Sequence, residues 1–251
     1  MKLRAEAAIL ILPRAGGKHF YDCEFKKALW MRVLIFGATG MVGQGVLREC
    51  LIDADIEAVL TVGRSPTEVQ NPKFREIVRQ DLFDYSTIDA DLTNLDACFF
   101  CLGISSAGLS EEKYTYLTYT LTLAAAETLV RLNPQMTFVY VSGAGTDSSE
   151  KGRVMWARVK GKTENALLRL PFKAAYMFRP GVIQPVHGER SKTTAYRIGY
   201  SIAKPVLPLL RRLFPRYVLT TEEIGRAMIH VASHRAPKKI LESWDIRECA
   251  R

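Results

Sequence analysis

Residues 33–43 read VLIFGATGMVG, and this stretch decides the fold, because four apolar residues run directly into three spaced glycines. The apolar run predicts a buried strand, and the residues from Met41 onward predict a helix. Gly37 lets the chain turn sharply, Gly40 lets the backbone approach a pyrophosphate, and Gly43 lets helix and strand pack closely. The first amides of the helix favour an anion. The stretch therefore predicts a dinucleotide-binding turn, and the alternative is a glycine-rich turn without a ligand.

The chain from Met31 onward repeats this alternation of apolar runs and helical stretches. The expected strands are residues 33–37, 58–62, 76–78, 97–102, 137–141, 174–178 and a short one near 240–241. The expected helices are residues 41–51, 111–132 with Ser110 as N-cap, 154–169, and one that begins near Thr220. Strands this apolar are buried on both faces, which indicates a parallel sheet. We expect an α/β fold, a Rossmann-type doubly wound parallel sheet, with a small C-terminal segment at residues 184–217 that covers the substrate.

Residues 1–30 do not share this pattern. They carry six basic and three acidic side chains, a third of the formal net charge of +9. Glu6 interrupts their short apolar stretch, and no small-residue cleavage site follows. We expect an N-terminal extension outside the fold, or the product of an upstream start codon, and disfavour a cleaved secretory signal. Residues 31–251 then form one NAD(P)-binding domain.

The composition excludes several classes of protein. With 48% hydrophobic and 24% charged residues, the chain is neither disordered nor collagen-like. Outside the extension the basic residues are spread among acidic ones, which disfavours nucleic acid as a partner. No apolar run reaches the roughly 20 residues that span a bilayer. The basic, apolar segment 197–217 is expected to form short helices over the substrate cleft, and a membrane-surface helix is the disfavoured alternative.

The five cysteines are odd in number and irregularly spaced, which indicates free thiols in a reducing, cytoplasmic location. Cys98 and Cys101 lie three apart in an expected strand, so they should point to opposite faces of the sheet. This placement suits buried small side chains better than a redox pair. The histidines have no evident metal-ligand partners, so we expect no metal.

The second expected strand ends in Arg64 and Ser65, where a dinucleotide site usually carries an acidic residue for the ribose hydroxyls. A guanidinium at this place can bind a 2′-phosphate bidentately, and Ser65 can add a hydroxyl donor. We therefore expect NADP rather than NAD as the cofactor. The alternative is that Arg64 is a solvated loop residue.

With these motifs in view, the chain resembles the short-chain dehydrogenase/reductase superfamily, and within it the atypical, NmrA-like branch. It is most similar to the Tat-interacting-protein oxidoreductase-like family, whose bacterial members are often labelled NAD-dependent epimerase/dehydratase. The resemblance runs from about Met31 to Glu242. It rests on Gly37–Gly43, Arg64, Asp81-Leu82, Cys101-Leu102-Gly103, Val141-Ser142-Gly143-Ala144, Val159-Lys160-Gly161-Lys162-Thr163-Glu164 and Phe178-Arg179-Pro180-Gly181.

The resemblance implies a set of cofactor contacts. Asp81 and Leu82 would flank the adenine ring, and Leu102 and Gly103 would lie beside the nicotinamide ribose. Ser142 would be the catalytic serine, and Lys160 the catalytic lysine that holds the nicotinamide ribose. The full set of cofactor contacts is Gly37, Thr39, Gly40, Met41, Val42, Gly43, Arg64, Ser65, Asp81, Leu82, Cys101, Leu102, Gly103, Ser142, Lys160, Arg179, Pro180 and Gly181.

One position departs from the family pattern Tyr-x-x-x-Lys, because Trp156 stands four residues before Lys160. The two share a helix face, so Trp156 occupies the place of the catalytic tyrosine. An indole N–H donates a hydrogen bond but does not release its proton near neutral pH, so Trp156 can orient a substrate but cannot act as the acid. The other candidate donors are Tyr114, Tyr116, Tyr119, Ser105, Ser106 and His187, each of which is more simply interpreted as an ordinary surface or loop residue.

Two functions remain open. The first is an NADP(H)-dependent oxidoreductase or epimerase-like enzyme that acts on a carbonyl or sugar-like small molecule. The second is a non-catalytic NADP(H)-binding sensor or regulator, which the tryptophan favours. The sequence leaves the substrate open, and also the choice between monomer and homodimer.

Overall fold

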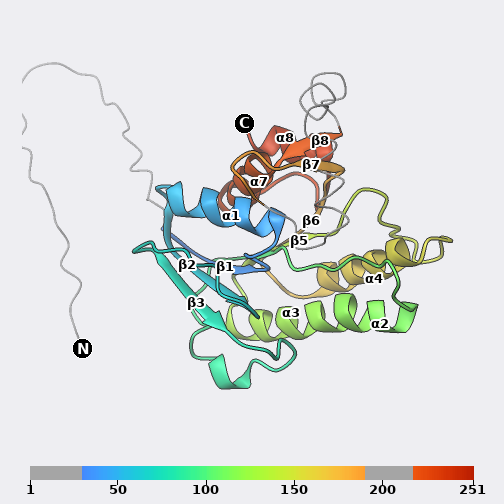
Figure 1. Ribbon diagram of the computed structural model, residues 1–251, viewed down its shortest axis with the longest axis horizontal. Helices are drawn as coiled ribbons and strands as arrows, with labels where there is room; N and C mark the ends of the chain where they lie inside the picture. Colours follow the sequence, from blue (N-terminus) through green and yellow to red (C-terminus); the bar gives the residue numbers. More distant parts are fainter. Residues whose placement is uncertain (1–29, 190–216) are drawn as a thin grey trace, which may run out of the picture.

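The computed structural model describes residues 30–189 and 217–251. Its centre is a parallel sheet of seven strands in the order β3-β2-β1-β4-β5-β6-β9 (Figure 1). The order in which successive strands join the sheet reverses between β1 and β4. Doubly wound sheets bind ligands at such a switch point. The strands are β1 Met31–Phe36, β2 Ile56–Gly63, β3 Phe74–Val78, β4 Ala97–Phe100, β5 Thr137–Val141, β6 Ala174–Arg179 and β9 Ile240–Glu242. This sheet confirms the expected Rossmann-type fold.

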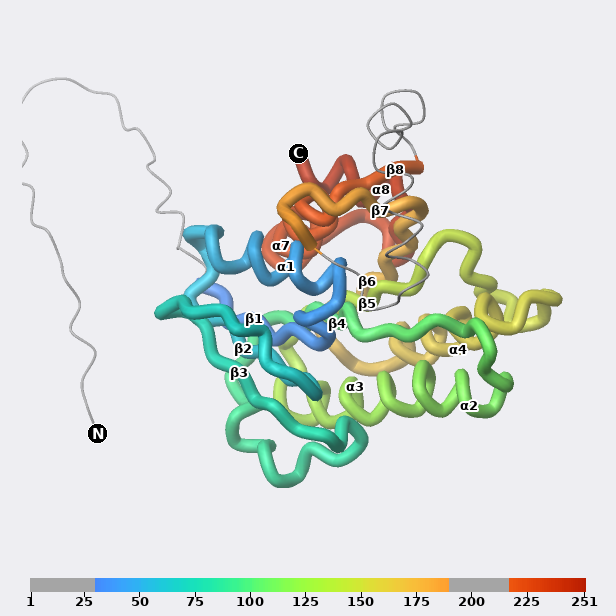
Figure 2. Tube along the Cα trace, viewed as in Figure 1, coloured from blue at the N-terminus to red at the C-terminus, as the bar shows by residue number. Residues whose placement is uncertain are grey.

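Helices cover both faces of the sheet, as Figures 1 and 2 show. On one face lie α1 Met41–Ile52, α7 Thr221–His234 and α8 Ser243–Cys249. On the other lie α2 Glu111–Thr115, the π-helical η2 Tyr116–Thr120, α3 Leu121–Leu132 and α4 Met155–Arg169, with the short η1 Ser86–Ile88 nearby. A separate parallel pair, β7 Val182–Gln184 and β8 Val218–Thr220, lies beside α8. Among the described residues, no helix has the length and apolarity to cross a membrane.

Alternate residues of each central strand enter different cores, which explains why these strands are apolar throughout. In β1, Val33 and Ile35 pack with α1 and α7, whereas Leu34 and Phe36 pack with α3. Cys98 and Cys101 follow the same rule: Cys98 lies in the α3-side core, and Cys101 packs against the α1-side core. Burial raises the pKa of both thiols, that of Cys101 to about 12. The expected opposite placement of the two cysteines is confirmed.

The helix ends lie close to where the sequence predicts them, but one expected helix is interrupted in its middle. Ser110 caps α2 through its side chain, and Thr220 and Glu223 form a capping box at α7. The helix expected over residues 111–132 is instead divided by the π-helical turn η2, where the hydrogen bonds reach one residue further. The spacing of apolar residues gives no sign of such a turn.

Helices α1 and α7 approach each other through glycines. A Cβ on Gly45 would lie 2.5 Å from the Cβ of Thr221, and one on Gly225 would lie 2.7 Å from the Cγ of Glu49. Larger residues would hold the helices apart. The helix that follows the glycine turn is thereby fixed against the C-terminal part of the chain.

Two of the sequence-based expectations fall mainly on residues outside the described ranges. The proposed N-terminal extension comprises residues 1–30, of which the structure describes only Trp30, an exposed side chain. Of the proposed substrate-covering segment 184–217, the structure describes residues 184–189 and 217. Both assignments stay predictions.

Candidate functional site

The glycine turn has the geometry that a phosphate-binding turn requires. Gly37 has φ +78°, and a Cβ there would lie 2.7 Å from the backbone nitrogen of Leu102. A Cβ on Gly43 would lie 2.1 Å from the carbonyl oxygen of Gly37, so the helix can pack here only without a side chain. Helix α1 begins directly after Gly40, which supplies no side-chain cap. Its first amides are therefore available to an anionic ligand at the carboxyl edge of the sheet.

The ends of β2 and β3 form the neighbouring part of this edge. Arg64 and Ser65 are exposed just beyond β2. Asp81 is exposed and accepts a hydrogen bond from the backbone N–H of Phe83 at 2.8 Å. Leu82 is only 3% exposed and belongs to the α3-side core, and its carbonyl accepts a hydrogen bond from the hydroxyl of Tyr85. Of the pair expected to flank adenine, Asp81 is thus accessible and Leu82 is largely covered.

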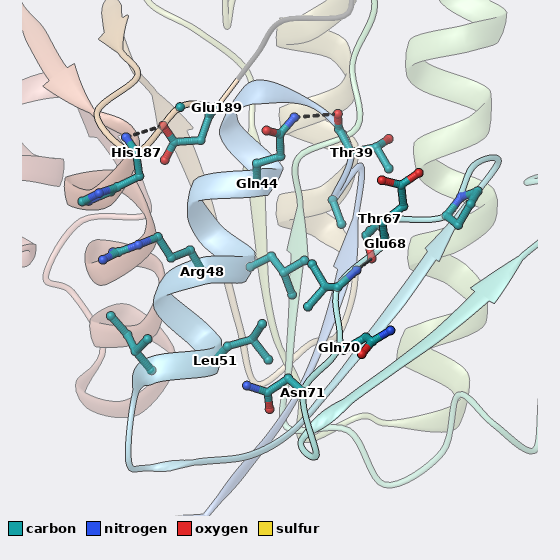
Figure 3. Close-up of a pocket in the computed structure, with 16 residues that line it drawn as sticks. Thr39, Gln44, Arg48, Leu51, Thr67, Glu68, Gln70, Asn71, His187 and Glu189 are labelled. Atoms are coloured by element: carbon teal, nitrogen blue, oxygen red, sulfur yellow. Dashed lines mark hydrogen bonds between the residues drawn. The ribbon is translucent and has the colours of Figure 1, made fainter.

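A cavity of about 660 Å³ opens beside the glycine turn (Figure 3). It lies between the outer side of α1, the loop of residues 66–71 that joins β2 to β3, and residues 187–189. This link between β2 and β3 contains no helix, although a helix usually joins parallel strands. The side-chain amide of Gln44 donates to the carbonyl of Thr39 at 3.0 Å and so ties α1 to the turn at the cavity wall. Since Ala38 and Thr39 also line the cavity, it is continuous with the turn.

Lys160 and Ser142 meet at the carboxyl end of β5. The ammonium of Lys160, on α4, donates a hydrogen bond to the main-chain carbonyl of Ser142. Burial lowers the pKa of Lys160 to about 8, against an opposing effect of the carboxylate of Glu164. Two residues that the sequence assigns to one site are thereby brought together, and the lysine can exchange its proton near neutral pH.

The hydroxyl of Ser142 points into the protein. Its side chain is 4% exposed, and its Oγ lies 2.5 Å from the Oε1 of Glu164 and 3.1 Å from the carbonyl oxygen of Phe178. Both neighbours accept hydrogen bonds, so the hydroxyl hydrogen is directed away from the open edge. Ser142 in this arrangement does not offer a proton to a ligand.

Glu164 and Arg179 form a buried ion pair behind this serine. Glu164 is fully buried and accepts from the Nε of Arg179 at 3.0 Å and from its Nη2 at 2.5 Å. The same guanidinium donates to the Oγ of Ser148 and contacts Glu242 at 3.4 Å. The hydrogen bonds to Glu164 raise the pKa of Arg179. The side chain of Arg179 is thus committed inside the protein, and a direct cofactor contact at this motif would fall to Pro180 and Gly181.

Sequence reasoning gave Glu164 no role, although it lies in a stretch that carries the family resemblance. A signal was present, because Glu164 follows Lys160 by four residues and therefore shares its helix face. The partner of Glu164 could not be found in this way, since Arg179 comes from the next strand.

Trp156 lies near the loop after β5. Its side chain is half-buried, and its outer ring carbon Cη2 is 3.6 Å from the place where a Cβ of Gly145 would stand. Gly143, directly after Ser142, has open space beside it. Trp156 is the position at which the sequence departs from the Tyr-x-x-x-Lys pattern of the family that it resembles.

The other candidate proton donors are held by local contacts. Tyr114 is 2% exposed, and Tyr116 stacks on Phe83 with ring centroids 4.5 Å apart. The ring of Tyr119 lies 4.7 Å from the ammonium of Lys162. Ser105 accepts a hydrogen bond from the N–H of Ala107, and Ser106 accepts one from the N–H of Leu109 through its carbonyl. His187 lies 3.1 Å from Glu222 on α7 and lines the cavity beside α1. These contacts favour ordinary structural roles.

Comparison with known proteins gives one family match and several curated relatives. The model of the NAD-dependent epimerase/dehydratase family matches residues 33–152. "Protein FMP52, mitochondrial" of Meyerozyma guilliermondii is 28% identical over 210 residues, covering 80% of this chain and 85% of the relative. The protein of the same name from Saccharomyces cerevisiae is 27% identical, covering 83% of this chain and 90% of the relative.

Solved structures show the same fold. The Bordetella bronchiseptica enzyme WbmF in complex with NAD⁺ has a TM-score of 0.63 at 14% identity, covering 88% of this chain and 77% of that one. A short-chain dehydrogenase/reductase family oxidoreductase from Burkholderia thailandensis has a TM-score of 0.61 at 16% identity, covering 86% and 92%. A UDP-N-acetylglucosamine 4-epimerase from Methanobrevibacter ruminantium has a TM-score of 0.61 at 13% identity, covering 84% and 75%.

The sheet order and the glycine turn define a Rossmann-type fold, and the partial family match supports a nicotinamide dinucleotide as its ligand. The partial family match, the curated relatives and the shared fold support the resemblance to atypical short-chain dehydrogenase/reductase-like proteins that is seen in the sequence. These findings support an NAD(P)-binding, oxidoreductase-like protein.

One expectation is wrong. We expected a cytoplasmic protein from the free cysteines, but the curated relatives are named mitochondrial. The reason is that free thiols indicate a reducing environment and do not identify the compartment that provides it.

Within the described ranges, no three histidine, cysteine, aspartate or glutamate side chains gather in a way that could hold a metal ion.

Proposed function

We propose that the chain is an NADP(H)-dependent oxidoreductase for a small carbonyl or sugar-like compound, in which Lys160 supplies the proton. The observation that carries this proposal is the ammonium of Lys160, held at the carboxyl end of β5 by the carbonyl of Ser142. It lies at the same edge of the sheet as the glycine turn. A dinucleotide that spans this edge would bring its nicotinamide toward Lys160.

The proposal assigns each part of the edge a task. The turn from Gly37 to Gly43 would hold the pyrophosphate, and Arg64 with Ser65 would hold the 2′-phosphate that distinguishes NADP from NAD. Asp81 would lie beside the adenine. Cys101, Leu102 and Gly103, which follow β4, would line the middle of the cofactor. Residues 31–251 would act as one domain, with residues 1–30 outside it.

The chemistry that the bound cofactor supplies is hydride transfer to a carbonyl carbon. As the carbon gains the hydride, the carbonyl oxygen becomes an alkoxide and needs one proton. Lys160 would donate that proton and become a neutral amine, which solvent then reprotonates. Its pKa of about 8 makes both steps accessible near neutral pH. Trp156 would orient the substrate without exchanging a proton.

A second function is favoured by a different observation. The hydroxyl of Ser142 is turned to Glu164 and Trp156 replaces the usual acid, so neither offers a proton to a substrate. A protein of this kind could bind NADP(H) and report its level to a protein partner without turnover.

One assay separates the two functions. Consumption of NADPH and of NADH is followed with a panel of aldehydes, ketones and nucleotide sugars, between pH 6 and pH 10. We expect NADPH to be preferred, and we expect the reductive rate to fall about tenfold for each pH unit above about 8, because the protonated form of Lys160 decreases there.

Two variants of Lys160 sharpen the result. Lys160→Arg keeps the positive charge but holds its proton, so cofactor binding should persist while reduction is lost. Lys160→Met should weaken both. Binding of NADPH without consumption on any substrate would favour the sensor, and faster consumption of NADH would contradict the role given to Arg64.

A further inference from the structure

Arg79 carries buried donor groups that the fold leaves unused. Its Nε and Nη1 are covered from solvent and have no hydrogen-bond partner among the described residues. The centre of its guanidinium lies 5.6 Å from the centroid of the Tyr85 ring, which is itself buried. Arginine stays ionised at all ordinary pH values, and covered N–H groups without an acceptor are unfavourable. A group with unused donors in this place is suited to an anionic ligand.

The position of Arg79 follows from the register of two strands. Gly63 in β2 pairs with Val78 in β3, and the backbone N–H of Arg79 donates to the carbonyl of Gly63 at 2.9 Å. The next residues along the two strands are Arg64 and Arg79. The two arginines therefore stand side by side at the carboxyl edge of the sheet, at the end where the adenosine of a dinucleotide would lie.

Nearby carboxylates do not neutralise this guanidinium by contact. The carboxylate of Asp84 accepts hydrogen bonds from the backbone N–H and the hydroxyl of Ser86, which together lower its pKa, and Arg79 adds a weaker effect. Asp81 accepts from the N–H of Phe83. Neither forms a salt bridge with Arg79 among the described residues. Arg75, on β3 shortly before Arg79, is by contrast paired with Asp91 at 2.8 Å.

We infer that Arg79 is a second specificity-determining arginine, which binds the 2′-phosphate of the cofactor's ribose together with Arg64. This inference rests on the proposed preference for NADP. A phosphomonoester carries close to two negative charges, so two guanidiniums match it better than one. Contact with the Tyr85 ring fixes the direction of the Arg79 side chain before the ligand arrives.

The test is calorimetric titration with 2′,5′-ADP and with 5′-AMP, which differ only in the 2′-phosphate. The wild type should bind 2′,5′-ADP more tightly. Arg79→Met keeps an unbranched apolar stem against Tyr85 and should weaken binding of 2′,5′-ADP by about 10- to 100-fold while leaving binding of 5′-AMP unchanged. Arg79→Lys keeps the charge without the planar fork and should lose less. The matched control is Arg75→Met, because Arg75 is an exposed arginine on the neighbouring strand β3. This variant should change neither affinity.

The outcomes separate the role inferred for Arg79 from the proposed preference for NADP. If the wild type binds both nucleotides equally, the preference for NADP fails, and the role of Arg79 fails with it. If the wild type prefers 2′,5′-ADP and Arg79→Met and Arg79→Lys keep that preference, only the role of Arg79 is overturned. Unchanged binding of 5′-AMP shows that a variant is folded, and Arg79→Lys serves as the test if Arg79→Met is not folded.

Discussion

The two ends of the same sheet edge are built in different ways. At the end of β1 the turn is defined by backbone: Gly37 and Gly43 leave room only for main-chain atoms, and α1 begins without a side-chain cap. At the end of β5 the site is defined by side chains, with Lys160 on the carbonyl of Ser142 and the hydroxyl of Ser142 on Glu164. The first end retains the family pattern, and the second departs from it at Trp156.

The difference indicates how such a fold can change its chemistry and keep its cofactor. A backbone site fails when almost any side chain is added, because the added atoms meet main chain that cannot move away. A side-chain site can lose or exchange one group while its neighbours stay packed. We therefore expect dinucleotide binding to withstand changes near β5 that keep the charge of Lys160, and turnover to be sensitive to them.

The largest expected effect is a gain of turnover in Trp156→Tyr. A tyrosine at this position shares a helix face with Lys160 and would restore a hydroxyl that can donate its proton, a contribution of about 10²- to 10⁴-fold in rate. The measurement is NADPH consumption with a carbonyl substrate, and Trp156→Phe is the control for size. An unchanged rate in Trp156→Tyr, with NADPH still bound, would show that a tyrosine hydroxyl does not improve on the proton supply proposed for Lys160.

Removal of the buried carboxylate should come next in size. Glu164→Ala leaves the guanidinium of Arg179 without its main partner in the interior, which should lower the free energy of unfolding by about 3–5 kcal/mol. Chemical denaturation measures this change, and the exposed Glu127→Ala on α3 is the matched control. The double variant Glu164→Leu, Arg179→Met should recover much of the loss, since both charges leave together. A loss under 1 kcal/mol in Glu164→Ala would mean that solvent reaches this pair.

The smallest expected change in the free energy of unfolding comes from the glycine turn at the end of β1. A Cβ in Gly43→Ala would meet the carbonyl of Gly37, so α1 must shift, at a cost of about 1–3 kcal/mol and with loss of NADPH binding. Gly63→Ala is the control, because a Cβ there would find its nearest neighbour 4.0 Å away. If Gly43→Ala bound NADPH as tightly as the wild type, the turn would not be the phosphate site, and the contrast between the two ends would fail.

Much of the fold was predictable because it is encoded locally. The apolar run 33–36, the three glycines and the capping residues Ser110 and Thr220 each specify a strand, turn or helix end within a few positions. The pairing of Glu164 with Arg179, and of Arg64 beside Arg79, depends on which strands and helices lie together. That information comes from the register of the sheet, which single-residue patterns do not contain.

The same limit applies to the direction of a side chain. Sequence reasoning brought Ser142 and Lys160 to one site, and the structure places them in contact. It could not show that the hydroxyl of Ser142 turns inward, because that depends on a buried carboxylate from α4. The roles given to these residues stay predictions.

The close packing of α1 on α7 has a consequence for the order in which the protein is made. The glycine turn lies near the start of the fold, but helix α1, which follows it, packs against Thr221 and Gly225, more than 170 residues later in the sequence. Contacts between such distant parts of a chain form late, since a long loop must close first. During synthesis, helix α1 therefore reaches its final support only after more than 170 further residues have left the ribosome. A truncated product would carry the motif without a fixed site.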